Sequence, residues 1–216
     1  MRVANQLVMV FVAVLLTFNA SAKKGDKVPA YIIKKNGDRI EGKVLLGSIT
    51  DHEIKVNFFK QGQSKKTVYK PNDLQGYGYE MTEVDDLGIK VKRWVHYETH
   101  KVDYPPKPFG PTKVFIEREE AGELNLYCYY IEVRNNPKKP YRYHYYIKGN
   151  DGKLRKITED LFRKEAKSLF KNYTALSTRV GQKQFLYRNL DRMVRDYNYW
   201  TVNRHDKNEY RVAMKE

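Results

Sequence analysis

Between residues 30 and 157, apolar and polar residues alternate in short runs, and most of these runs end near glycine, proline or asparagine. Side chains of a β-strand point alternately to its two faces, so this alternation is typical of strands with one buried face. The runs recur about every ten residues, a spacing that favours a small barrel or sandwich. Within them, Asn36-Gly37 predicts a hairpin because both residues tolerate positive φ.

Two of these runs carry specific expectations. The alternation over Glu53–Phe58 predicts a strand with Ile54, Val56 and Phe58 on one face. The run Leu74–Tyr79 predicts another strand, and its glycines permit bends or close packing against neighbouring groups.

The last third of the chain changes to a helical period. Apolar residues recur at i, i+4, i+7 and i+11 twice, first at Phe162, Ala166, Leu169 and Tyr173, then at Leu186, Leu190, Met193 and Tyr197. This spacing places each set on one helix face, and Thr158 suits the N-cap of the first helix. The polar residues from Thr201 onward are expected to fray.

Together these patterns predict an α+β protein. An antiparallel, strand-rich N-terminal and middle region is followed by a C-terminal helical hairpin that packs on the sheet. Whether the strands form one domain or two is left open. The predicted parts are a signal peptide (1–22), a β-rich N-terminal region (23–103), a second β region (104–157), a helical hairpin (158–200) and a polar tail (201–216).

The first 22 residues have the pattern of a cleavable signal peptide. Arg2 precedes the apolar run Leu7–Phe18, and Ala20-Ser21-Ala22 supplies small residues for cleavage after Ala22. We therefore expect an exported protein, either periplasmic or secreted. No second apolar run reaches 18 residues, so no transmembrane helix is expected after signal removal.

Several short patterns recur in a known group of sequences. They are Asn36 to Lys43 (NGD-x-I-x-G-K), Gly122-Glu123-Leu124-Asn125, Tyr145-Tyr146-Ile147 and Tyr197-Asn198. In these patterns the chain resembles a broad group of uncharacterised exported proteins of Bacteroidetes-type bacteria. The resemblance implies an exported protein of similar architecture. It implies no activity and no catalytic or binding residues.

The charge balance is strongly basic. The chain has 41 Lys and Arg against 26 Asp and Glu, a formal net charge of +15. Such an excess attracts anionic partners, here an anionic envelope component or another envelope protein. The basic residues are spread along the chain, which disfavours nucleic acid as the partner. Alternatively, the charge only keeps the protein soluble. The oligomeric state is left open.

The 18 tyrosines supply the first candidate site. If the strands around residues 127 and 143 pair, their aromatic residues predict a face that stacks sugars or unpaired bases beside a basic group. Alternatively, these tyrosines only pack across strands, as tyrosine often does. The candidate binding residues are Tyr127, Tyr129, Tyr141, Arg142, Tyr143 and Tyr145.

A second, weaker candidate is a metal site. On a strand, His96, Glu98 and His100 would share one face, a donor set that suits zinc. Alternatively, the segment is a surface strand edge, and our expectation is that the protein uses no cofactor or metal. Cys128 is the only cysteine, which excludes an intramolecular disulfide and a cysteine-rich zinc site.

Catalytic patterns are few. The acidic groups Asp85-Asp86, Glu117-Glu119-Glu120 and Glu159-Asp160 offer paired carboxylates of the kind that cleave glycosides. The sequence lacks G-x-S-x-G, H-E-x-x-H, P-loop and dinucleotide patterns.

We therefore expect a non-enzymatic envelope protein that binds a partner or an anionic envelope component through a basic, tyrosine-rich surface. The alternatives are a hydrolase of an envelope polymer and a structural or assembly protein. An acidic pair in a cleft with a raised pKa would favour the hydrolase.

Overall fold

A computed structural model describes residues 23–85, 87–103, 112–133, 136, 141–160 and 162–213. Ten strands form one antiparallel sheet, and the helices follow mainly at the C-terminal end, so the protein is α+β. The predicted signal peptide and its cleavage at Ala22 lie outside the described residues.

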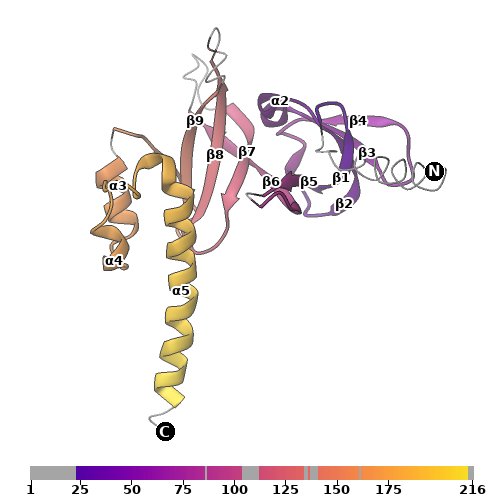
Figure 1. Ribbon diagram of the computed structural model, residues 1–216. Helices are drawn as coiled ribbons and strands as arrows, with labels where there is room; N and C mark the ends of the chain where they lie inside the picture. The colour runs from indigo at the N-terminus through magenta and orange to yellow at the C-terminus, as the bar shows by residue number, and fades with distance from the viewer. Residues whose placement is uncertain are drawn as a thin grey trace, which may run out of the picture.

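The elements follow one another along the chain as Figure 1 shows. The strands are β1 (Lys27–Lys34), β2 (Arg39–Leu45), β3 (Val56–Lys60), β4 (Lys66–Tyr69), β5 (Leu74–Val84), β6 (Lys90–Val102), β7 (Thr112–Glu120), β8 (Asn125–Glu132), β9 (Tyr141–Lys148) and β10 (Leu154–Ile157). The helices are α2 (Ile49–Ile54), α3 (Phe162–Leu169), α4 (Thr174–Ser177), the 3-10 turn η1 (Tyr187–Asn189) and α5 (Leu190–Ala213).

The strand order in the sheet is β10-β9-β8-β7-β6-β5-β1-β2-β3-β4. The chain runs from β1 to the β4 edge, returns to pair β5 with β1, and then runs to the β10 edge. The sheet is not closed into a barrel, so that part of the prediction is wrong. The hairpin at Asn36-Gly37 is confirmed, because β1 and β2 pair there and Gly37 has a φ of 91°.

The two faces of the sheet have different surroundings. One side of the sheet, which we call the groove face, carries Tyr31, His96, Glu98 and Arg118, as the strand registers show. The helix face is the other side, and it holds two cores. One core lies within the N-terminal strands, and the other lies between β8, β9 and the helices α3 to α5. Figure 1 shows these helices on one side of β8 and β9.

Helix α2 fills a split in the sheet. Strand β7 pairs with β6 from Thr112 but with β8 only over Glu117–Glu120, beyond which β7 and β8 separate. Helix α2 packs against both strands there. The Glu53 Oε1 atom accepts a hydrogen bond from the Tyr130 N–H at 2.5 Å. The helix thus supplies a backbone donor of β8 with the acceptor that β7 does not provide.

The predicted strand over Glu53–Phe58 is therefore partly wrong. Val56 and Phe58 are buried as expected, but Ile54 ends α2 and is 55% exposed. The helix forms because Ser48 and Asp51 make a capping box, in which each side chain bonds the backbone N–H of the other residue. Helical periodicity then buries Glu53 and exposes Ile54.

The C-terminal helices confirm the predicted buried faces in part, because Leu169 is half-buried and Tyr173 and Leu186 lie outside α3 and α5. Phe162 and Ala166 of α3 and Leu190, Met193 and Tyr197 of α5 are all buried. The second helix begins at Leu190 instead of Leu186 and runs to Ala213, so it continues beyond Thr201, where the polar tail was expected to begin. No glycine or proline interrupts residues 190–213, which removes the usual stop signals. Figure 1 shows the end of α5 extending beyond the sheet.

Asn198 fastens α5 to the turn before β8. Its Oδ1 accepts from the Leu124 N–H at 2.9 Å, and its Nδ2 donates to the Leu124 carbonyl at 2.8 Å. Gly122 leaves room for this side chain, since a Cβ there would lie 2.4 Å from Asn198. Two of the sequence patterns quoted for the resemblance, around Gly122 and at Tyr197-Asn198, therefore meet in space.

Candidate ligand-binding face

The predicted aromatic face does not form as one surface. In the β8–β9 register, Tyr145 lies opposite Cys128 and Tyr143 lies opposite Tyr130. Odd-numbered residues of β9 therefore share a face with even-numbered residues of β8. Tyr127 and Tyr129 lie on the groove face, whereas Tyr143 and Tyr145 lie on the helix face.

Packing accounts for most of these tyrosines. Tyr127 is 1% exposed, and Tyr129 and Tyr145 are also buried. Tyr143 is half-buried and stacks on Tyr187 with ring centres 6.2 Å apart. Tyr141 and Arg142 are exposed at the start of β9, and for these two a binding role stays a prediction.

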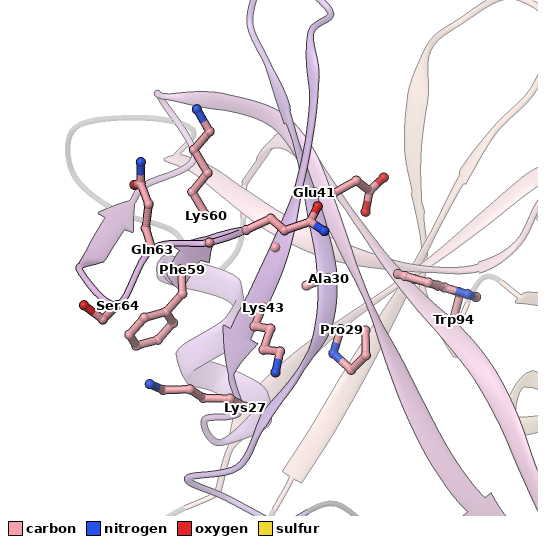
Figure 2. A pocket seen from close by; sticks show the side chains of 13 residues that line it. Lys27, Pro29, Ala30, Glu41, Lys43, Phe59, Lys60, Gln63, Ser64 and Trp94 are labelled. Carbon is pink, nitrogen blue, oxygen red and sulfur yellow. The ribbon is translucent and has the colours of Figure 1, made fainter.

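A different part of the groove face carries exposed aromatic and basic groups. A hollow of about 670 Å³ lies over β1, β2, β3 and β6, and we call it the lysine groove. In Figure 2, Phe59 and Trp94 lie on opposite sides of Lys43. The functional side chains that line it are Lys27, Lys43, Lys60, Phe59 and Trp94.

Strand pairing fixes the positions of these groups. Lys43 of β2 lies opposite Pro29 of β1 and Phe59 of β3, so the three share a face. The ammonium group of Lys27 lies 3.9 Å from the centre of the Phe59 ring, a favourable cation–π distance. Trp94 reaches the same hollow from β6 and is 40% exposed.

The groove has a positive charge. Its acidic residue, Glu41, bonds Arg39 at 2.7 Å. Within the described part of the chain, Lys27, Lys43 and Lys60 form no ion pair. Lys60 lies opposite Gly42 and therefore shares a face with Phe58 instead of Phe59, and Figure 2 shows its side chain pointing away from Lys27 and Lys43. Two ammonium groups, those of Lys27 and Lys43, are therefore available to an anionic ligand in the groove.

Tyr31 connects the lysine groove to a second hollow. Its ring lies over Gly78, where a Cβ would come within 2.7 Å of the ring. The Arg39 guanidinium lies 3.5 Å from the Tyr31 ring centre, and the Trp94 ring centre is 5.6 Å away. Glycine at position 78 thus allows an aromatic and basic strip to continue along the groove face.

The second hollow, of about 350 Å³, contains the predicted metal candidates. His96, Glu98 and His100 do share one face of β6. However, the Glu98 carboxylate accepts hydrogen bonds from Arg118 at 2.7 Å and from Tyr127 at 2.8 Å, and it lies 3.2 Å from His100 Nε2. Its oxygens are thus already engaged, and among the described residues no cluster of three metal-ligating side chains is found.

These partners also set the charge of Glu98. Burial alone would raise its pKa, but the hydrogen bonds from His100 and Tyr127 and the charge of Arg118 outweigh burial. Together they lower the pKa of Glu98 to about 2. His96 makes a separate contact, in which Nδ1 lies 2.6 Å from the Tyr31 hydroxyl.

A third hollow, of about 410 Å³, lies on the helix face beside α2. It contains the predicted acidic pair Glu117 and Glu119. Burial, together with the charge of Glu119, raises the pKa of Glu117 to about 7, and burial also raises the pKa of Glu119. Burial lowers the pKa of His52 to about 4. Arg93 bonds Glu83 at 2.7 Å and lies 3.9 Å from Glu117.

The other acidic groups lie outside these hollows or serve structure. The Asp85 Oδ1 atom accepts from the backbone N–H groups of Leu87 and Ile89, which closes the β5–β6 turn. Asp86 lies outside the described residues. Glu159 and Asp160 lie in the turn before α3 and line a further, smaller hollow there.

Comparison with protein-family models, with curated proteins and with solved structures found no match. In the described chain no helix combines the length and apolar character needed to cross a membrane. We therefore infer a function from the geometry and charge of the two faces of the sheet.

Proposed function

We propose that this protein is a non-enzymatic binding protein for an acidic glycan of the cell envelope, and that the lysine groove holds the glycan. The observation that carries the proposal is the arrangement of Phe59 and Trp94 around Lys27 and Lys43, two lysines without ion pairs to any described residue, in one open hollow. The predicted signal peptide supports an envelope location.

The chemistry of the groove matches such a ligand. The C–H face of a sugar ring packs on an aromatic ring, and Phe59 and Trp94 offer two such rings. Lysine ammonium groups on flexible stems then meet carboxylate or phosphate groups without demanding one geometry. A repeating polymer needs this tolerance, and the net charge of +15 speeds its approach.

The test is binding to a defined acidic polysaccharide, polygalacturonate, with neutral dextran as the control polymer. We expect binding to polygalacturonate that weakens as salt rises, because exposed charges are screened beyond about 10 Å at 0.1 M salt. Dextran should bind far more weakly. Equal binding to both polymers, or binding insensitive to salt, would contradict the proposal.

The aromatic contribution needs its own variant. Trp94→Ala removes an exposed ring from the groove, while Tyr199→Ala removes an exposed ring from α5 as a matched control. We expect about fivefold weaker binding for the first variant, near 1 kcal/mol. The control should bind as the unaltered protein does. Equal losses of affinity in both variants would show that Trp94 does not contact the glycan.

A second candidate function, hydrolysis of an envelope polymer, is favoured by one observation. Glu117 and Glu119 share the hollow on the helix face, and both have raised pKa values. A carboxyl group with a pKa near 7 can donate a proton to a leaving group at neutral pH. Release of new reducing ends from polygalacturonate or peptidoglycan, lost in Glu117→Gln, would support it. If the unaltered protein releases no reducing ends from either polymer, hydrolysis of these polymers is contradicted and binding remains the proposed function.

A further inference from the structure

The second hollow on the groove face combines side chains from strands that are far apart in the sheet. Tyr31 comes from β1, His96 from β6, Arg118 from β7 and Lys148 from β9, and all four line the same 350 Å³. Four strands, β5 to β8, lie between β1 and β9 in the strand order, yet both contribute to this hollow, so the sheet curls over this face. The curl makes a concave site from a surface that would otherwise be flat.

The hollow contains one carboxylate, that of Glu98, and the oxygens of this carboxylate already have hydrogen-bond partners. Glu98 interacts with Arg118, Tyr127 and His100, so it orients Arg118 and leaves little capacity to bind a cation. Lys148 forms no ion pair within the described residues, although it is half-buried. With Glu98 compensating Arg118, Lys148 leaves the hollow with an excess positive charge.

His96 adds a hydrogen-bond donor. When the Tyr31 hydroxyl donates to Nδ1, the ring carries its proton on Nε2, which forms no hydrogen bond to any described residue. The pKa of His96 is lowered by burial and by the charges of Arg118 and Arg39. The ring is therefore neutral at pH 7 and lies in a positive potential, which an anion would relieve.

We propose that this hollow binds a single phosphate group, with Arg118, Lys148 and His96 as its donors and Glu98 as the positioning residue for Arg118. A phosphate dianion suits a small concave site in which cationic and neutral donors converge from several strands. The site is separate from the lysine groove and does not depend on glycan binding there.

The experiment titrates the protein without its predicted signal peptide (residues 23–216) with inorganic phosphate, glucose 1-phosphate and glucose. The histidine ring signals are followed by NMR. Bound phosphate stabilises the imidazolium form, so the pKa of His96 should rise toward or above its ordinary value near 6.5. The pKa of His52, on the other face, should not move. His96→Gln assigns the signal. The titratable and charged groups around His96 are Tyr31, Arg39, Glu98, His100, Arg118 and Lys148.

Binding variants complete the test. We expect at least about tenfold weaker phosphate binding in Lys148→Gln and in Arg118→Gln, and no change in Lys153→Gln, an exposed lysine in the β9–β10 turn. If Arg118→Gln fails to fold because Glu98 loses its partner, the phosphate affinity of Lys148→Gln still tests the proposal. No shift of the His96 pKa at saturating phosphate, or an unaltered affinity in Lys148→Gln, would overturn the proposal.

The ligands distinguish the source of the phosphate. Tighter binding of glucose 1-phosphate than of inorganic phosphate would assign the site to a sugar phosphate. Equal binding of the two would assign it to free phosphate, and both results support the site. Equal binding of glucose itself would contradict it. Because these molecules are too small to span the lysine groove, their failure would leave the glycan proposal intact.

Discussion

Glu98 on β6 and Glu117 on β7 lie on neighbouring strands, and their side chains leave opposite faces of the sheet. Burial acts on both carboxyl groups, yet the pKa of Glu98 falls to about 2 and that of Glu117 rises to about 7. Glu98 has Arg118, Tyr127 and His100 at 2.7 to 3.2 Å, whereas Glu117 has the Tyr97 hydroxyl at 3.5 Å and Arg93 at 3.9 Å.

The difference shows that partners, more than burial, decide the charge of a carboxyl group in this sheet. The groove face carries charges that are fixed at neutral pH, which suits attraction of an anionic ligand. The helix face carries carboxyl groups whose pKa values are raised, that of Glu117 to about 7, and Glu53 belongs with them because burial raises its pKa to about 8. Such groups suit proton transfer or structure.

The comparison predicts opposite effects of pH on stability. Glu53 and Glu117 bind protons more tightly in the folded chain, so their stabilisation is complete below about pH 4.5 and is lost as pH rises toward 8. Glu98 behaves in the reverse way, and its stabilisation is lost as pH falls from about 4.5 to 2. The stabilisation from Glu53 and Glu117 alone would fall by roughly 6 kcal/mol between pH 5 and 8. The buried His52, whose pKa is lowered to about 4, regains about 2 kcal/mol over the same range, so urea unfolding should show a net loss of roughly 4 kcal/mol.

Two variants assign these pH dependences of stability to single residues. Glu53→Gln should flatten the loss above pH 5, and Glu98→Gln should flatten the loss at acid pH. A stability that rises steadily from pH 5 to 8 would contradict the raised pKa values on the helix face.

The contact between Glu53 and Tyr130 gives the next largest effect. Glu53→Ala leaves the Tyr130 N–H without an acceptor and removes packing between α2 and β8, at a cost of about 2 kcal/mol. Glu53→Gln keeps an acceptor oxygen and resembles the protonated acid. At pH 7 it should cost far less. Equal losses in the two variants, measured by urea unfolding, would show that this hydrogen bond does not hold α2.

The groove face offers a smaller structural test. Gly78→Ala places a Cβ against the Tyr31 ring and should cost about 1 kcal/mol, with weaker glycan and phosphate binding as Tyr31 moves. Gly149→Ala is the control, because its nearest contact is Leu124 at an ordinary 3.5 Å. Unchanged stability and binding in Gly78→Ala would show that the position of Tyr31 does not matter.

Local patterns in the sequence predict much of this fold. The Asn36-Gly37 hairpin, the strand over Tyr141–Lys148 and the buried faces of α3 and α5 follow from turn chemistry and periodicity. Helix α2 could also have been found, since Ser48 and Asp51 are spaced as a capping box. The alternation over Glu53–Phe58 concealed it, because the first two of these six residues end the helix and the last three begin β3.

The site depends on information that alternation does not contain. Which tyrosines share a face depends on the β8–β9 register, and a shift of one residue moves every side chain to the other face. The lysine groove needs β1 to pair with both β2 and β5, which brings Trp94 near Lys43 across strands distant in sequence. Only the excess of basic residues pointed to an anionic ligand.

The most direct test of the proposed function compares the affinities of three proteins for polygalacturonate at low salt: the unaltered chain, Lys27→Gln/Lys43→Gln and Lys153→Gln. A contact between two opposite charges at 4 Å in water contributes about 1 kcal/mol, so the double variant should bind at least tenfold more weakly. The Lys153 variant should match the unaltered protein. Equal affinities in all three proteins would mean that the lysine groove does not hold the glycan.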